Sequence, residues 1–269
     1  MTAPTQRPTA DRNVMLPLRR GGSGAPLFCV HPGSGFGLPY AGLLPHLDAR
    51  VPVHAVQARG LVTADGLPSS LDEMAADYTE QIRRVQPAGP YRLLGWCVGG
   101  RLAFEIACRL RAQGEHVGLL ALVSTSPPGP EPLPGPEEIL RAMLLPPGVD
   151  ELDAGLARLC RLPLDYASLS AHLVRTGHPM RRLTEPALTA VYEVYRTNEH
   201  LYRTPVSRVF DGDALSLEPS APGGPARRSW QPFVGGRVLA RSVDGRHTEM
   251  MEPGPARAVG AAVNEALGY

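Results

Sequence analysis

The chain of 269 residues contains no lysine, because all 27 of its basic residues are arginine. This absence excludes Schiff-base chemistry and a lysine general base. The 27 basic residues nearly balance 26 acidic ones, and no long basic block is present. Nucleic acids bind proteins through concentrated positive charge, so we expect no nucleic-acid partner.

Cysteine and long apolar runs are also scarce. The four cysteines are Cys29, Cys97, Cys108 and Cys160. They show no C-x-x-C spacing, which argues against a zinc site and a disulfide framework. No run approaches the ~18 apolar residues of a membrane span, and the N-terminus has no apolar signal core. We therefore expect a cytoplasmic protein with no membrane contact. Residues 1–15 are predicted to form a disordered tail or linker, and residues 16–269 one domain.

Short apolar runs alternate with helical stretches along the chain. The expected strands are 27–30, 53–56, 92–94, 119–123, 206–210 and 238–243, and the first helices are 71–84 and 101–112. This rhythm predicts an α/β fold with a mostly parallel sheet flanked by helices. Between residues 123 and 206 a proline-rich passage leads into helices expected at 137–145, 151–160 and 184–201. We expect this insertion, residues 127–204, to form a helical lid over the carboxyl ends of the strands.

The segment Gly95-Trp96-Cys97-Val98-Gly99 has the pattern of a nucleophile elbow, with cysteine in place of serine. An elbow places its nucleophile in a strained turn between strand and helix, where flanking Cβ atoms would collide. An apolar strand precedes Cys97, and an amphipathic helix follows it. We expect the helix dipole to favour the Cys97 thiolate. The alternative is a structural cysteine buried in a glycine turn.

His247 is the second catalytic candidate. It lies in the segment Val243–Met250, after the last expected strand and before the terminal helix. A loop at this place faces the same sheet edge as Cys97 and follows the hydrolase order of nucleophile, acid and histidine. The alternative is a structural role, which we also expect for His31.

Taken together, these residues resemble the α/β-hydrolase thioesterase domains that end nonribosomal peptide and polyketide assembly lines, especially the peptide-synthetase type. The resemblance begins at Leu16 and rests on the segments Pro26–Gly35, Val56–Gly60, Gly89–Trp96 and Gly245–Pro253. It implies transfer of an acyl or peptidyl chain from the phosphopantetheine arm of a carrier protein, with no bound cofactor or metal. It also implies an oxyanion hole formed by the backbone N–H groups of Val98 and Gly33.

The sequence departs from this family at two positions. Cys97 stands where the family usually has serine, and Ser124 stands where it usually has the aspartate of the triad. We expect the acid to lie instead after the strand at 206–210, at Asp213 or Asp211, with a slight preference for Asp213. The alternative is that both aspartates only solvate a turn.

Transfer of the chain to Cys97 would exchange one thioester for another, so the acyl-enzyme would keep its activation. We therefore expect release by intramolecular cyclisation or aminolysis more than by hydrolysis. Three alternatives stay open: an editing thioesterase acting in trans, a cysteine hydrolase of free esters or lactones, and a non-catalytic interaction domain. Met143, Leu144, Leu145 and Tyr192 are candidates for lining the acyl chamber, although each could simply pack the lid.

Overall fold

A computed structural model describes residues 14–62, 67–146, 149, 151–221 and 228–269. In these residues a seven-stranded sheet has the order β1-β3-β2-β4-β5-β6-β7. Its strands are β1 (Met15–Arg19), β2 (Leu27–Val30), β3 (Val53–Val56), β4 (Tyr91–Trp96), β5 (Val117–Val123), β6 (Ala214–Pro219) and β7 (Val238–Val243). Only β1 runs antiparallel to its neighbour. The carboxyl ends of the other six strands therefore share one edge of the sheet.

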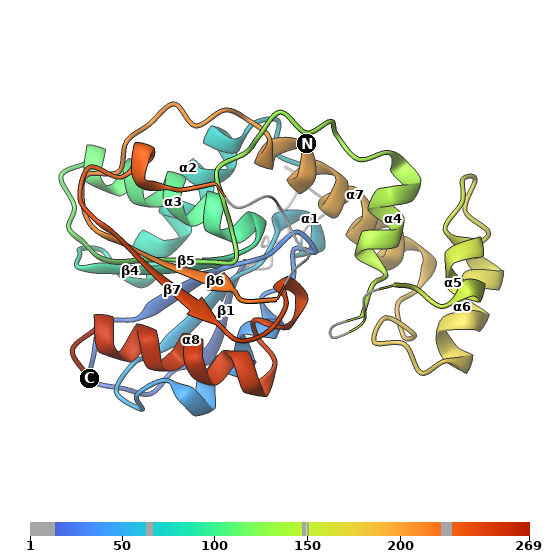
Figure 1. Cartoon of the computed structure of the whole chain (residues 1–269), viewed down its shortest axis with the longest axis horizontal. Helices are drawn as coiled ribbons and strands as arrows, with labels where there is room; N and C mark the ends of the chain where they lie inside the picture. Colours follow the sequence, from blue (N-terminus) through green and yellow to red (C-terminus); the bar gives the residue numbers. More distant parts are fainter. Residues whose placement is uncertain (1–13, 63–66, 147–148, 150, 222–227) are drawn as a thin grey trace, which may run out of the picture.

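Helices cover both faces of the sheet (Figure 1). On one face lie α2 (Leu71–Val85) and α3 (Val98–Ala112); on the other lie the 3-10 helix η1 (Leu38–His46) and α8 (Pro253–Ala266). The strand residues alternate between two apolar clusters. In β2, for example, Phe28 and Val30 face the first cluster, and Leu27 and Cys29 face the second. A strand buried on both faces needs such a continuous apolar run.

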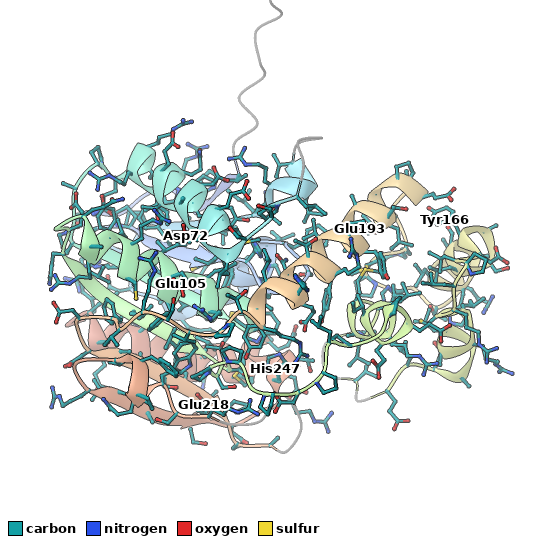
Figure 2. The ribbon with its side chains drawn as sticks, turned by 90° about the horizontal axis from the view of Figure 1, so that it is seen from above. Asp72, Glu105, Tyr166, Glu193, Glu218 and His247 are labelled. Carbon is teal, nitrogen blue, oxygen red and sulfur yellow. The ribbon has the colours of Figure 1, made fainter. Side chains whose placement is uncertain are left out.

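The predicted helical insertion lies between β5 and β6, beside the main domain (Figure 1). It contains α4 (Pro136–Met143), α5 (Ala154–Leu159), α6 (Tyr166–Arg175) and α7 (Glu185–Tyr202), and has an apolar cluster of its own. Figure 2 shows Tyr166 at the outer end of this lid, far from His247 in the main domain. The helix α7 joins the two parts, because it contacts α4 as well as α3 and α1 (Arg59–Val62).

Two expectations about element bounds were wrong. No strand occupies residues 206–210: Phe210 makes only an isolated bridge with Val234, and β6 begins at Ala214. The expected tail also reaches too far. Val14 is buried and Met15 begins β1, whereas residues 1–13 lie outside the described part of the chain. Among the helices that the structure describes, none combines the length and the apolar character that a bilayer crossing needs.

Candidate active site

Cys97 sits in a strained turn between β4 and α3. Its φ is 59° and its ψ −129°, a conformation that non-glycine residues rarely adopt. The neighbouring glycines are required by space. A Cβ on Gly95 would lie 2.0 Å from the carbonyl oxygen of Gly99, and one on Gly99 would lie 2.2 Å from that of Val30. The turn therefore has the backbone geometry that the sequence predicted for a nucleophile elbow.

Tyr40 ties this turn to the end of β2. The N–H of Trp96 donates to the Tyr40 hydroxyl at 2.9 Å, and that hydroxyl donates to the carbonyl of Val30 at 2.5 Å. Tyr40 is completely buried, so water does not compete for either bond. The elbow and the loop after β2 are consequently held in one fixed arrangement.

The backbone N–H groups of Val98 and Gly33 both hydrogen bond to the sulfur of Cys97. Two amides from separate loops thus converge beside the sulfur, and these are the two amides expected from the family resemblance to form an oxyanion hole. Burial nevertheless raises the pKa of Cys97 to about 12, and the nearby Glu199 adds to this effect, while the two amides oppose it. The amide of Val98, at the N-terminus of α3, lowers the pKa in the direction expected from the helix dipole, but desolvation of the sulfur outweighs it.

The Gly33 loop is also held from the lid. The side-chain amide of Asn198 on α7 donates to the carbonyl of Gly33 at 2.9 Å, and Asn198 is 2% exposed. A Cβ on Gly33 would lie 3.3 Å from the Tyr195 ring, so α7 packs directly on this loop. His31, in the same segment, is fully buried between the Tyr78 hydroxyl and the Pro32 carbonyl, in keeping with a structural role.

His247 begins the short 3-10 helix η3 (His247–Glu249), between β7 and α8. Its Nδ1 lies 2.7 Å from Oγ of Ser124, and its carbonyl accepts a hydrogen bond from Nε1 of Trp96 at 2.9 Å. Burial lowers the pKa of His247 to about 4, although a hydrogen bond with the Ser124 backbone opposes this shift. The imidazole is therefore neutral around pH 7.

Ser124 occupies the first position after β5, with a φ of 45°. Its N–H donates to the carbonyl of Leu217 in β6 at 2.7 Å. The two residues that follow are held as well: Nε1 of Trp230 donates to the carbonyl of Thr125, and the Tyr202 hydroxyl donates to that of Ser126. The Ser124 side chain is consequently fixed against His247. Sequence reasoning noted the missing charge at this position but did not predict this hydrogen bond.

Asp211 and Asp213 do not follow a strand; they precede β6 and lie at the other end of it. Asp211 forms an ion pair with Arg111 at 2.7 Å, and Asp213 accepts the backbone N–H of Arg237 at 2.8 Å. Neither borders the pocket that contains Cys97 and His247. Their prediction as the triad acid was wrong because it depended on a strand at 206–210. They instead bind arginines around a turn.

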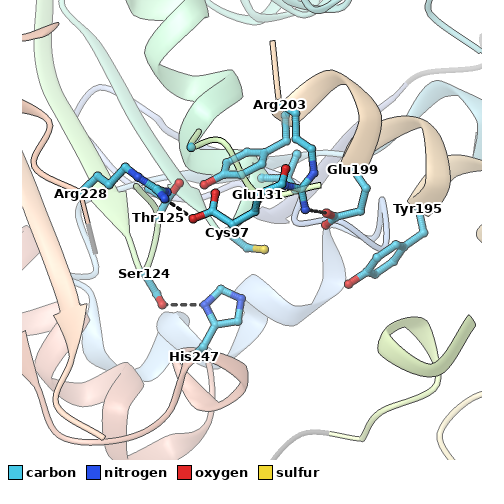
Figure 3. Close-up of a pocket in the computed structure, with 12 residues that line it drawn as sticks. Cys97, Ser124, Thr125, Glu131, Tyr195, Glu199, Arg203, Arg228 and His247 are labelled. Carbon is cyan, nitrogen blue, oxygen red and sulfur yellow. Dashed lines mark hydrogen bonds and ion pairs between the residues drawn. The ribbon is translucent and has the colours of Figure 1, made fainter. Parts of the chain in front are cut away.

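Cys97 and His247 open into one cavity of about 240 Å³, in which Figure 3 shows the sulfur above the imidazole ring. The cavity is lined by Cys97, Val98, Ser124, Thr125, Gly129, Glu131, Tyr195, Glu199, Tyr202, Arg203, Arg228 and His247. The predicted lining residues Met143, Leu144 and Tyr192 pack into the apolar cluster of the lid instead, and Leu145 does not border the cavity either. Most of the lid-side lining comes from the last turns of α7.

Residues 25–263 match the family model described as the thioesterase domain. The chain belongs to the thioesterase domain family. It is 35% identical over 260 residues to the dimodular nonribosomal peptide synthase of Bacillus subtilis (strain 168), covering 92% of this chain and 10% of the synthase. It is 34% identical over 277 residues to malpinin synthetase of Mortierella alpina, covering 99% of this chain and 3% of the synthetase. The chain thus spans a tenth or less of these relatives.

Solved structures agree with this family. The four-domain nonribosomal peptide synthetase AB3403 matches with a TM-score of 0.79 and 25% identity, over 94% of this chain and 20% of its own. The NocB thioesterase domain, in covalent complex with a fluorophosphonate nocardicin G analog, matches with a TM-score of 0.69 and 26% identity, over 95% of this chain and 100% of its own. The thioesterase domain is therefore of the nonribosomal-peptide-synthetase type, with the predicted α/β-hydrolase fold.

Proposed function

We propose that this domain takes a peptidyl or acyl chain from the phosphopantetheine thioester of a carrier protein onto Cys97, and releases it by cyclisation, aminolysis or hydrolysis. One observation carries the proposal: the sulfur of Cys97 lies among the amides of Val98 and Gly33, in the same cavity as a neutral His247. The kinship with nonribosomal peptide synthetases supports the class of substrate and the carrier-protein partner. No resident cofactor enters the scheme.

His247 acts as a general base in the acylation step. Its Nδ1–H donates to Ser124, which leaves the lone pair of Nε2 free to accept the thiol proton of Cys97. The sulfur attacks the thioester carbonyl as this proton leaves, and the amides of Val98 and Gly33 bind the oxyanion. The pantetheine sulfur then departs and takes the proton from His247. The pair starts as neutral thiol and neutral imidazole, not as thiolate and imidazolium.

Ser124 orients the imidazole without neutralising its charge. A carboxylate in this position would stabilise the imidazolium that forms during attack, whereas a hydroxyl supplies only a dipole. A thiol gives up its proton more readily than an alcohol and is intrinsically more nucleophilic, so it needs less assistance from the base. The two departures from the family, at Cys97 and at Ser124, are therefore chemically compatible with each other.

The acyl-enzyme would be a thioester, which keeps the activation of the substrate. Its carbonyl remains reactive toward an amine or hydroxyl of the same chain, or toward an external amine. A thioester acyl-enzyme therefore favours cyclising or aminolytic release more than an oxygen-ester acyl-enzyme would. If Cys97→Ser gives the same ratio of cyclic to hydrolysed product at the same rate, this explanation of the cysteine fails.

The test is intact-protein mass after mixing the domain with a peptidyl-pantetheine thioester. We expect an acyl adduct on the wild type and none on Cys97→Ala. Cys108→Ala is the matched control, since Cys108 lies on α3 but outside the cavity, and it should keep the adduct. A wild type that stays unmodified would overturn the proposal. A free ester of the same acyl chain is tested in parallel. If it acylates Cys97 as well as the pantetheine thioester does, the domain is a hydrolase that needs no pantetheine arm.

A further inference from the structure

Glu199 is a carboxylate of the catalytic cavity that the acylation step does not use. It lies on α7, next to Asn198, and lines the cavity together with Cys97. Figure 3 shows its side chain between Arg203 and Tyr195, with the carboxylate facing the cavity. It is 18% exposed, and it is close enough to the sulfur to raise the pKa of Cys97. The cavity thus contains an acidic group beside the atom that would carry the acyl chain.

The two carboxylates of the cavity have different partners. Glu131 forms a close ion pair with Arg228, and its backbone carbonyl accepts a hydrogen bond from Arg203. Within the described residues, Glu199 has a single ion pair, with Nη2 of Arg203 at 4.0 Å, which is beyond hydrogen-bond distance. No donor within the described residues makes a hydrogen bond to its carboxylate, and Nε of Arg203 is itself buried without a partner. The acceptor sites of Glu199 are therefore available to a ligand in the cavity.

A partly buried carboxylate with free acceptor sites selects a cation that carries N–H donors. The ammonium form of an amine meets this requirement, whereas water and alcohols bring no charge. Burial raises the pKa of Glu199, and the nearby guanidinium of Arg203 opposes this effect. A carboxylate of raised pKa is a stronger base toward such an ammonium than an exposed one.

We propose, on the basis of the proposed function, that Glu199 binds the amine that captures the chain from Cys97 and accepts a proton from it. The amine enters as an ammonium and gives one proton to the Glu199 carboxylate. Its nitrogen then forms a bond to the acyl carbon, and the C–S bond to Cys97 breaks. His247 takes a second proton from the nitrogen and passes it to the departing sulfur, which restores the thiol.

This scheme gives each proton an acceptor. An ammonium that becomes an amide loses two protons, and a single neutral histidine can carry only one of them at a time. The sulfur of Cys97 receives one proton, and Glu199 retains the other until it is lost to solvent. The charges of the ammonium and of Glu199 cancel, so the products in the cavity are all neutral.

The test compares how one acyl-enzyme divides between two nucleophiles. Wild type, Glu199→Gln and the control Glu193→Gln are acylated with the same peptidyl-pantetheine thioester, and then receive a fixed concentration of glycinamide. Glu193 is the matched control because it lies on α7, outside the cavity, and pairs with Arg196 (Figure 2). We expect Glu199→Gln to lower the ratio of amide to hydrolysed product about tenfold or more, and Glu193→Gln to leave it unchanged.

A ratio is independent of how fast the acyl-enzyme forms, so an effect of Glu199 on acylation does not enter it. An unchanged ratio in Glu199→Gln overturns the inference while leaving the proposed function intact. A wild type that forms no acyl-enzyme overturns the proposed function instead. Methanol in place of glycinamide tests the role of charge. If Glu199→Gln lowers the ratio of captured to hydrolysed product equally with glycinamide and with methanol, Glu199 has a general role that does not depend on charge. If the variant lowers the melting temperature without changing the ratio, its role is structural.

Discussion

The sheet-side wall of the cavity consists of strand ends and tight turns, whereas the lid-side wall is one face of α7. On the sheet side, the turn around Cys97 leaves no room for a Cβ on Gly95 or Gly99, and Trp96 donates hydrogen bonds to the Tyr40 hydroxyl and the His247 carbonyl. On the lid side, the side chains of Tyr195 and Glu199 line the cavity from α7. In the proposals above, the sheet-side wall supplies the nucleophile and the base, and the lid-side wall supplies the group that binds the incoming amine and accepts its proton.

The largest effect should come from removing the base on the sheet side. We expect His247→Ala to lower the rate of acylation by about 10²–10⁴, the range for a positioned general base. The measurement is the rate of adduct formation with a peptidyl-pantetheine thioester. His200→Ala is the control, since His200 is an exposed residue in the last turn of α7. Comparable losses in both variants would contradict the role of His247 as the base on the sheet-side wall.

The second prediction concerns the elbow itself. A Cβ on Gly99 would collide with the carbonyl oxygens of Val30 at 2.2 Å and His31 at 2.6 Å, which are backbone atoms of a buried strand end. We expect Gly99→Ala to lower the free energy of unfolding by about 3 kcal/mol, as severe overpacking does. Urea unfolding measures it. Gly254→Ala, where a Cβ would meet nothing within 4 Å, should not destabilise the fold.

The third prediction uses pH to examine the partner of His247. The neutral imidazole is the base, and burial lowers its pKa to about 4, so acylation should stay constant above that pH and fall below it. In Ser124→Asp a carboxylate would stabilise the imidazolium, which raises the histidine pKa and moves the acid limb of the pH–rate profile upward. Ser124→Ala should not move the limb upward. A limb at the same pH in Ser124→Asp would show that position 124 does not control His247.

The smallest effect should come from the hydrogen bond between the two walls, from Asn198 on α7 to the Gly33 carbonyl. Asn198→Ala removes the donor to the Gly33 carbonyl and leaves that buried acceptor unpaired, which should cost about 1–2 kcal/mol. Because the Gly33 amide is one of the two proposed oxyanion donors, we expect the acylation rate to fall several-fold as well. Urea unfolding and adduct kinetics measure the two effects. A loss of stability without any change in rate would mean that α7 supports the fold but not the oxyanion loop.

The sequence allowed prediction of the parts of the site that steric demands determine. A strand–turn–helix around Cys97 has no space for Cβ atoms beside the nucleophile, so the flanking glycines indicate this turn, and the residues after a parallel strand must lie at its carboxyl edge. Five of the seven strands, and the elements flanking Cys97, could be placed in this way. Residues 206–210 contain valine and phenylalanine, which favour strands, but the strand of this region is β6, four residues further along the chain. In β6 the buried Ser216 instead has a polar partner, Glu218, two residues along the strand, which a local pattern does not reveal.

The hydrogen bond of Ser124 to His247 could not be predicted, because it depends on how the end of β5 lies against η3. Serine carries no negative charge, so the sequence alone pointed to Asp211 or Asp213 as the acid. The hydrogen bond to His247 joins residues 123 positions apart, and it depends on the left-handed φ of Ser124 at the end of β5. The cavity lining was mispredicted for a related reason. Apolar lid residues such as Met143 find partners within the lid, and polar residues of α7 face the cavity instead.

The cations of the cavity, Arg203 and Arg228, are both guanidinium groups, and the chain has no lysine anywhere. A guanidinium stays protonated at every pH at which proteins are stable, so it provides positive charge without a nucleophilic nitrogen. A lysine beside an acylated Cys97 could capture the chain by S-to-N transfer and form an amide that the enzyme cannot cleave. A thioester formed on Cys97 would thus be exposed to incoming amines, while the lining of the cavity offers no side-chain amine to inactivate it.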